Sequence, residues 1–204
     1  MSDKYKNFAE LSAVEVYGVD YQISYVSRPS KVVVMAIHGG GIETGTSELT
    51  VDIAGSMQSY YLFEGLKPTG NGDLHITSTN FDEPNALRLV NNASYCITLH
   101  GYADSTKKHT LIGGADHDIK LQVYNKLIAS GFSSELLDES DRLSGSDPAN
   151  IVNKTKRGMG VQLEISTAQR NAFFGINTRD DRKNTQTDEF YRYTQAIKNI
   201  FSLL

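Results

Sequence analysis

VVVMAIHGGGIE, at residues 32–43, joins a continuous apolar run to a glycine-rich turn with a histidine at one end and a glutamate at the other. The run from Val32 to Ile37 is rich in β-branched residues and lacks polar alternation, which is typical of a strand covered on both faces. In open α/β sheets, ligands lie beyond the carboxyl ends of the strands. The stretch therefore predicts a buried strand followed directly by two candidate functional residues, His38 and Glu43.

Two further strand-like runs carry polar residues of the same kinds. SYCITLHGY, at residues 94–102, ends a second apolar run in His100 and Gly101, and GVQLEIS, at residues 160–166, places Glu164 in an otherwise apolar segment. A buried charge is costly unless it is paired or functional. Strand alternation puts Glu164 on the face opposite Val161, Leu163 and Ile165. The spacing leaves open whether that face is functional or exposed to solvent.

Two histidines and two glutamates at strand ends can supply three zinc ligands and a general base. Glycines allow a tight turn, so His38 and Glu43 can reach one ion, and His100 completes the set from a neighbouring strand. The competing interpretation is that the two histidines are unrelated core or surface residues. Three other histidines are expected at the surface: His75 in an alternating segment expected to be a strand, His109 among polar residues, and His117 at a helix start.

The same glycines fit two other motifs less well. His38-Gly39-Gly40-Gly41 matches the oxyanion-hole stretch of some serine esterases, but no pentapeptide in the chain fits the G-x-S-x-G elbow that those enzymes need. A dinucleotide-binding loop is a second alternative. The glycine spacing departs from its usual fingerprint and leaves His38 and Glu43 unexplained.

Composition is that of a globular protein with a core. The 204 residues fit a single domain, 1–204, with 39% hydrophobic and 22% charged residues. The net charge of −4 gives no indication of nucleic-acid binding, so an anionic substrate requires a local basic groove.

Cys96 is the only cysteine and lies in an apolar run, which indicates a buried, inert thiol and favours intracellular synthesis. The polar N-terminus has no apolar signal region, and no run is long enough to span a membrane. We expect a protein made in the cytoplasm without a signal peptide, with no membrane partner. If it acts outside the cell, lysis or another non-classical route has to release it.

Apolar runs alternate with helical patterns along the chain. This order predicts an α/β fold, a single-domain open mixed sheet, mostly parallel, flanked by helices. Strands are expected at 32–37, 60–64, 73–77, 94–99, 111–114 and 161–165, with further edge strands in the first 30 residues. Helices are expected at 46–59, 83–92, 116–130 and 188–204, and a long polar loop at 138–160.

Several of these segments together resemble the phage-related poly-γ-glutamate hydrolases of Bacillus, over roughly positions 10–200. They are the turn from His38 to Glu43, Phe81-Asp82-Glu83-Pro84, Leu99-His100-Gly101-Tyr102, Ile112-Gly113-Gly114 and the strand around Glu164. The resemblance implies a zinc carboxypeptidase-like fold, Zn²⁺ on His38, Glu43 and His100, and Glu164 as general base. Four residues separate His38 from Glu43, whereas carboxypeptidases have two between the corresponding ligands, so the kinship to those enzymes is structural analogy.

The implied activity is zinc-dependent hydrolysis of γ-glutamyl amide bonds in poly-γ-glutamate, as in degradation of a capsule. We expect a monomer with no nucleic-acid partner. Each residue of this polymer carries a free carboxylate, which arginine binds well. Arg88, Arg157 and Arg170 are the candidates for this contact, and the loop at 138–160 for one wall of the groove.

Two alternatives keep the metal and change the role. One is a zinc carboxypeptidase or N-acyl amino-acid amidohydrolase that acts on small substrates. The other is a non-enzymatic polyanion-binding protein with a structural metal. Structural zinc usually has four protein ligands, often cysteines, and this chain offers no obvious fourth ligand.

Overall fold

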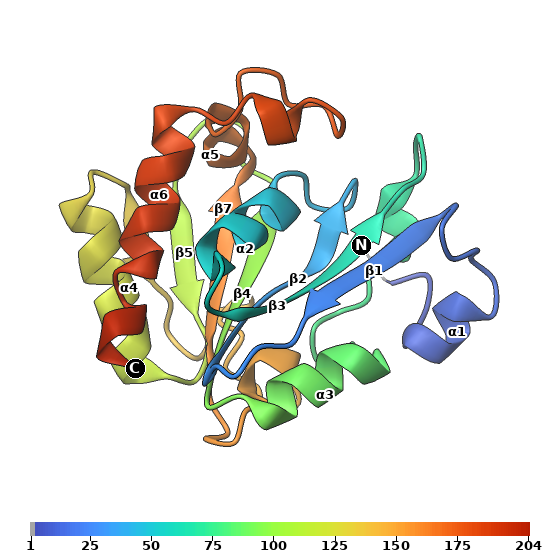
Figure 1. Ribbon diagram of the computed structural model, residues 1–204, viewed down its shortest axis with the longest axis horizontal. Coiled ribbons are helices and arrows are strands. Elements are labelled where there is room, and N and C mark those ends of the chain that lie inside the picture. Colours follow the sequence, from blue (N-terminus) through green and yellow to red (C-terminus); the bar gives the residue numbers. More distant parts are fainter. Residues whose placement is uncertain (1–2) are drawn as a thin grey trace.

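A seven-stranded sheet with the order β1-β3-β2-β4-β7-β5-β6 forms the centre of the computed structural model, which describes residues 3–204 (Figure 1). Strands β3, β2, β4 and β7 are parallel neighbours, whereas β1 pairs with β3 and β5 pairs with β7 in antiparallel register. The strands are β1 Tyr21–Val26, β2 Val32–Gly40, β3 Ser59–Gly65, β4 Tyr95–Tyr102, β5 Thr110–Gly113, β6 Ser134–Leu136 and β7 Val161–Ser166. The predicted fold class, an open and mostly parallel mixed sheet flanked by helices, is confirmed.

Six α-helices and four short 3₁₀ helices connect the strands in the described residues. The α-helices are α1 Phe8–Ser12, α2 Thr46–Ala54, α3 Pro84–Asn92, α4 His117–Ala129, α5 Thr167–Ala172 and α6 Asp188–Lys198, and the 3₁₀ helices are η1 Asn71–Leu74, η2 Ile151–Asn153, η3 Arg182–Asn184 and η4 Phe201–Leu203. Side-chain hydrogen bonds cap the N-termini of several helices. Glu83 accepts a hydrogen bond from the Ala86 amide, and Asp116 accepts one from the Ile119 amide.

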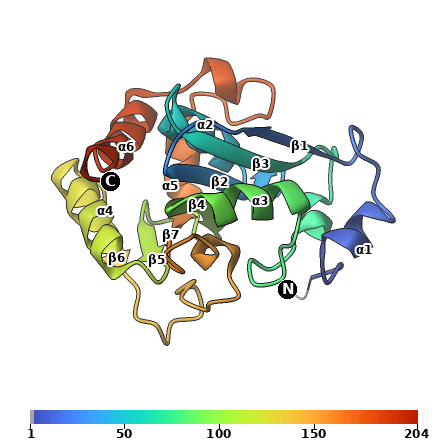
Figure 2. The ribbon, with the colours of Figure 1, turned by 60° about the horizontal axis from the view of Figure 1, so that its bottom comes forward.

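Both faces of the sheet are covered, as the apolar run in β2 predicts. Val32 and Val34 belong to a core cluster with α2, α4 and α6, whereas Val33, Met35 and Ile37 belong to a second cluster with α3. Figure 2 shows α3 lying over one face of the sheet, with α4 and α6 grouped on the other side of the molecule. Burial on both faces is the reason that β2 contains no polar residue before His38.

Some predicted boundaries are wrong. The segment expected to be a strand at 73–77 is instead the end of η1 followed by a connection outside the sheet. Helix α2 ends at Ala54, before the expected residue 59, because Gly55 adopts a positive φ of 54°. The terminal helix ends at Lys198, and η4 follows it.

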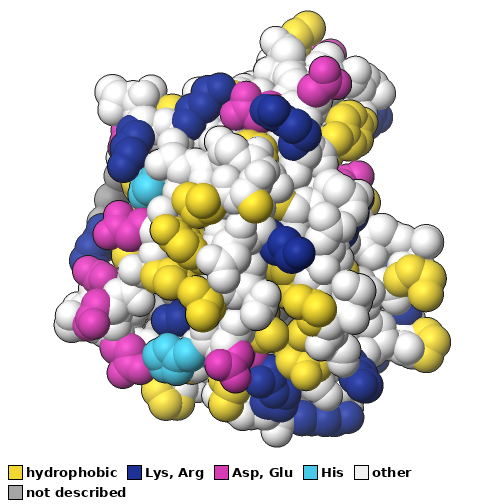
Figure 3. Space-filling view, turned by 90° about the vertical axis from the view of Figure 1, so that its left-hand side faces the viewer, with side chains coloured by type: hydrophobic (Ala, Val, Ile, Leu, Met, Phe, Trp, Pro, Cys, Tyr) yellow, Lys and Arg dark blue, Asp and Glu magenta, His cyan; other side chains and the backbone are white. Residues whose placement is uncertain are grey.

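The side of the molecule formed by α4 and α6 mixes acidic and basic side chains, with apolar ones between them (Figure 3). Leu121, Ile128 and Tyr191 are among its exposed apolar residues. Cys96 is buried in the sheet, as predicted, and burial raises the pKa of its thiol. In the part of the chain that the structure describes, none of the helices is both long enough and apolar enough to cross a bilayer.

Candidate active site

His38 and His100 meet at the carboxyl ends of the neighbouring strands β2 and β4. Both side chains are buried, and their Nδ1 atoms lie 3.1 Å apart. Nε2 of His38 donates a hydrogen bond of 2.8 Å to the carbonyl oxygen of Ile76. A carbonyl can only accept, so this bond assigns the proton of neutral His38 to Nε2 and leaves a lone pair on Nδ1. His38 thus directs an unprotonated nitrogen toward His100.

The glycine turn after β2 brings Glu43 to the same point. Gly40 has a φ of 65°, and a Cβ there would lie 2.5 Å from the carbonyl oxygen of Gly65, so only glycine fits. The carboxylate of Glu43 then lies 3.2 Å from Nδ1 of His38 and 3.5 Å from Nδ1 of His100. It also accepts a hydrogen bond of 3.0 Å from the Gly101 amide.

Donor atoms of three residues therefore converge in a form that suits a divalent metal. A tetrahedral zinc with bonds of about 2.0–2.1 Å requires ligand atoms about 3.3 Å apart. The two Nδ1 atoms are 3.1 Å apart, Oε1 of Glu43 lies 3.2 Å from Nδ1 of His38, and Oε2 of Glu43 lies 3.5 Å from Nδ1 of His100. Burial of Glu43 opposes its ionisation, but the two histidines outweigh burial and hold the pKa of its carboxyl well below the usual range. An ionised carboxylate and two imidazole nitrogens are a chemically suitable donor set.

Glu164 lies beside this cluster because β7 pairs with β4 in a register that places Glu164 opposite His100. Its face of β7 is not solvent-exposed, since Gln162, Glu164 and Ser166 are all buried. Burial raises the pKa of the Glu164 carboxyl to about 7, and the negative charge of Glu43 adds to the shift while His100 opposes it. A carboxyl with a pKa near neutrality can both accept and return a proton.

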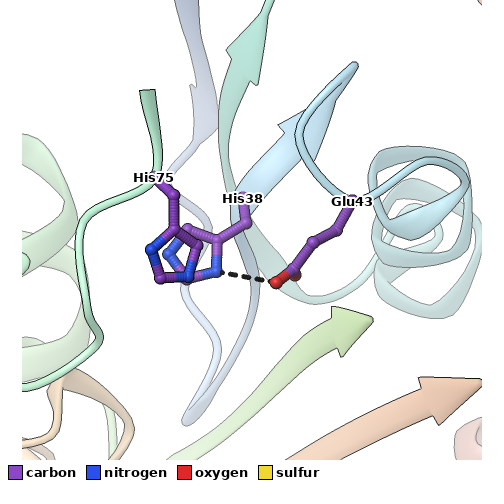
Figure 4. Close-up of side chains that lie close together, drawn as sticks. All are labelled: His38, Glu43 and His75. Atoms are coloured by element: carbon purple, nitrogen blue, oxygen red, sulfur yellow. Dashed lines mark ion pairs between the residues drawn. The ribbon is translucent and has the colours of Figure 1, made fainter. Parts of the chain in front are cut away.

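His75 was expected at the surface in a strand, and this expectation is wrong. It follows η1, and its ring packs against His38 with a centroid distance of 4.0 Å. A ring nitrogen of His75 lies within 4.8 Å of donor atoms on His38 and Glu43 (Figure 4). Nδ1 of His75 donates to Oδ1 of Asp3 at 2.7 Å. Of the other two histidines, His117 is exposed, as expected, but His109 is buried.

These residues line a cleft with a volume of about 1080 Å³. One wall is the segment 139–150, which belongs to the long polar loop expected at 138–160, and another is the segment 72–79. Arg142 lies on the loop wall and is the only lysine or arginine among the described residues that line the cleft. Its side chain makes no ion pair within the described part of the chain. Three carboxylates share the outer cleft with it, those of Asp3, Glu139 and Asp147.

The arginines suggested by the sequence lie elsewhere. Arg88 is exposed on α3, where its guanidinium lies 5.3 Å from the ring centroid of Tyr25. Arg157 pairs with Asp116 and covers the ring of Tyr95, at the amino end of β4 and therefore at the opposite end of the sheet from His100. Neither side chain lines the cleft.

Arg170 lies behind the cleft rather than in it. Its guanidinium is buried and donates to the carbonyl oxygens of Ile165 and Thr44, at 3.1 and 2.8 Å. It also packs against Gly101, leaving no space there for a Cβ. Arg170 thus joins the turn that carries Glu43 to the ends of β4 and β7, and its donors are occupied by the protein.

A model of the poly-gamma-glutamate hydrolase family matches residues 5–196 of the chain. The chain belongs to this family. It is therefore an enzyme that hydrolyses amide bonds, and the alternative of a non-enzymatic polyanion-binding protein is wrong.

Individual relatives agree with the family assignment. The SPbeta prophage-derived UPF0714 protein YoqZ of Bacillus subtilis (strain 168) is 48% identical over 196 residues, covering 96% of this chain and 70% of that protein. A bacteriophage poly-gamma-glutamate hydrolase structure is 40% identical with a TM-score of 0.95, over 99% of this chain and 98% of that one. The zinc-free, apo structure of YNDL is 42% identical with the same TM-score of 0.95, over 98% of each chain.

Sequence reasoning missed three residues of the cleft, Asp3, His75 and Arg142. Asp3 and His75 are 72 residues apart, and neither stands in an apolar run whose end could draw attention to it. Arg142 had a usable signal, since it lies within the long loop that was expected to form a wall of the groove.

Proposed function

We propose that this enzyme hydrolyses the γ-glutamyl amide bonds of poly-γ-glutamate with a Zn²⁺ ion held by His38, Glu43 and His100. The observation that carries the proposal is the convergence of two imidazole Nδ1 atoms and one carboxylate within 3.1–3.5 Å, beside a buried glutamate at the base of a cleft. Degradation of a capsule made of this polymer is the corresponding biological role. The zinc-free form of the YNDL relative supports the choice of metal.

The bound zinc supplies Lewis-acid chemistry, which polarises the amide carbonyl and lowers the pKa of water. The protein supplies the proton transfers. The carboxylate of Glu164 accepts a proton from the attacking water as the new C–O bond forms at the amide carbon. Glu164 then delivers this proton to the leaving nitrogen as the C–N bond breaks. One water is consumed, and a carboxyl and an amine are released.

Arg142 is our candidate for substrate binding, in place of Arg88 and Arg157. An anionic polymer meets repulsion from Asp3, Glu139 and Asp147 in the cleft, and Arg142 offers an unpaired guanidinium on the same wall. A guanidinium can bind a carboxylate through two parallel hydrogen bonds. Arg170 keeps a supporting role, since its hydrogen bonds hold the Glu43 turn and the end of β7 together.

The cleft accommodates either a polymer segment or a small substrate. Its volume of about 1080 Å³ lies near the upper end of the range of about 300–1,000 Å³ that is common for small-ligand pockets. Short N-acylated glutamates are the second candidate class. The two classes are separated by comparing kcat/KM for poly-γ-glutamate with kcat/KM for such short compounds.

Size-exclusion chromatography of poly-γ-glutamate after incubation with the purified enzyme tests the proposal directly. We expect shortening of the polymer that EDTA abolishes and added zinc restores. Glu164→Gln should retain zinc but lose most of the activity. If folded, zinc-loaded enzyme leaves the polymer intact while it cleaves short acylated glutamates, the polymer is not the substrate.

A further inference from the structure

His75 and Asp3 lie in the cleft but have no part in the mechanism above. Asp3 accepts two hydrogen bonds, from Nδ1 of His75 at 2.7 Å and from the Thr77 amide at 2.6 Å. A carboxylate can only accept, so the neutral His75 ring carries its proton on Nδ1 and has a lone pair on Nε2. Histidines that bind metals are commonly held in this way, with the second ring nitrogen donating to a carboxylate.

The position of His75 fits the same chemistry. His38, Glu43 and His75 each offer a donor atom, and these atoms lie within 4.8 Å of one another. Figure 4 shows the His75 ring overlapping the His38 ring, with the Glu43 carboxylate at the edge of the His38 ring, where the dashed line marks their ion pair. Two overlapping sets of two histidines and one carboxylate therefore share His38 and Glu43, one completed by His100 and the other by His75. Such sets are recurrent sites for divalent metals.

His75 differs from the other two histidines in two respects. Its side chain is 36% exposed, whereas those of His38 and His100 are each 2% exposed. Its segment follows η1 outside the sheet, so it is not fixed by strand pairing. Of the three histidines, His75 is thus the one whose side chain is most open to the cleft.

We propose that His75 is an exchangeable fourth ligand of the metal centre, held in place by Asp3 and released when substrate occupies the cleft. Four protein donors retain the ion in the resting enzyme, and departure of His75 provides the open position that a catalytic zinc site requires. This inference rests on the metal centre of the proposed function, but it is independent of the identity of the substrate.

Metal binding without substrate provides the test. Zinc dissociation constants are measured by competition with a chromophoric chelator, and the absorption spectrum of the Co²⁺-substituted enzyme reports the ligand set. His75→Ala should raise the zinc dissociation constant about 10- to 100-fold and change the cobalt spectrum. Asp3→Asn should weaken binding less, because it leaves the imidazole in place. His117→Ala, which removes an exposed histidine outside the cleft, should match the wild type in both measurements.

The controls separate the possible failures. Circular dichroism of each metal-free variant establishes whether it is folded. If His75→Ala is unfolded, His75→Gln serves as the second variant. His38→Ala should lose most zinc binding, and if it binds zinc like the wild type, the proposed metal centre itself is wrong. If the folded His75→Ala variant has the cobalt spectrum of the wild type, the ligand assignment is overturned. The same holds for His75→Gln where that variant is used. A changed spectrum in an enzyme that leaves poly-γ-glutamate intact supports His75 as a ligand and contradicts only the substrate.

Discussion

The side-chain amide of Gln162 donates a hydrogen bond of 2.9 Å to Oε1 of Glu164, and both side chains are buried on the same face of β7. The carbonyl oxygen of the same amide accepts a bond of 2.9 Å from Nδ2 of Asn150. Asn150 belongs to the cleft wall that also carries Arg142. The orientation of the proposed general base is therefore fixed through Gln162 by the loop that borders the substrate cleft.

Replacement of Gln162 by methionine keeps the approximate size of the side chain and removes the bond to Glu164. We expect kcat to fall about tenfold, which corresponds to about 1.4 kcal/mol, with zinc affinity within about twofold of wild type because no metal donor is touched. The lost hydrogen bond stabilised the carboxylate, so the acidic limb of the pH profile of kcat/KM should move to higher pH.

The matched control for this change is Gln22→Met, since Gln22 makes a bond of 2.8 Å to Glu64 outside the cleft. Its kinetics should equal those of the wild type. A Gln162→Met enzyme with an unshifted pH profile and normal kcat would show that Gln162 does not position Glu164.

Glu164 should destabilise the metal-free protein at high pH. The pKa of its carboxyl is about 7 in the folded protein, against an ordinary value of 4.5. Between these values the folded chain holds a proton that the unfolded chain has lost, so this group's contribution to stability falls as pH rises through the window. Glu164→Gln removes the effect. It should be up to about 3 kcal/mol more stable than wild type at pH 8, with little difference below pH 4.5.

Urea unfolding of both metal-free proteins across this pH range measures the difference. Asp118→Asn, which changes an exposed carboxylate on α4, should differ from wild type by a small and constant amount. A gap between Glu164→Gln and wild type that does not grow with pH would contradict the burial argument.

Loss of the Arg142 guanidinium should weaken binding of the polymer. Arg142 is exposed on the cleft wall, and solvent limits the strength of an exposed ionic contact, so we expect Arg142→Ala to raise KM about three- to tenfold. Arg142→Lys should recover part of the loss, because it keeps the charge without the two-pronged geometry. Arg88→Ala, on α3 outside the cleft, is the control. Equal KM values for Arg142→Ala and Arg88→Ala would remove Arg142 from the binding site.

Arg182 should be important for stability because it is a buried cation with specific partners. Its Nε donates to Oε1 of Glu48 at 2.7 Å, and its Nη2 donates to the carbonyl oxygen of Gly40 at 3.2 Å. Arg182→Met leaves the Glu48 carboxylate without its counterion, a change that typically costs about 3–5 kcal/mol. The free energy of unfolding, measured by urea titration, should therefore decrease by about 3–5 kcal/mol.

The double variant Arg182→Met with Glu48→Gln should recover part of the loss, because the uncompensated charge is also removed. Arg192→Met, on the exposed side of α6, should have an effect of less than about 0.5 kcal/mol. Additive losses in the double variant would show that the pair is not coupled.

Local patterns in the sequence were sufficient for the strands because burial on both faces leaves a continuous apolar run. Residues 32–37, 94–99 and 161–165 were recognisable on this ground, and all three are central strands. The prediction of a strand at 73–77 was wrong. The alternation there arises because Leu74 and Ile76, on either side of His75, are buried, but the segment follows η1 and does not join the sheet.

The direction of the strands explains which arginine assignments had to be revised. Arg157 precedes β7, so it lies at the amino ends of the parallel strands, whereas His38 and His100 lie at the carboxyl ends. This distinction follows from chain order once the sheet is known to be parallel. The burial of Arg170 behind Gly101 does not follow from chain order, because its hydrogen-bond partners include residues as distant in the chain as Thr44.

The sequence by itself determined the parallel core and the candidates His38, Glu43, His100 and Glu164, because strand burial and a glycine turn are properties of neighbouring residues. Only the tertiary structure decided that Glu164 faces the histidines, that Asp3 reaches His75, and that Arg142 enters the cleft. These contacts depend on strand register and on loops that meet across the end of the sheet. They join residues far apart in the chain, and no local periodicity records them.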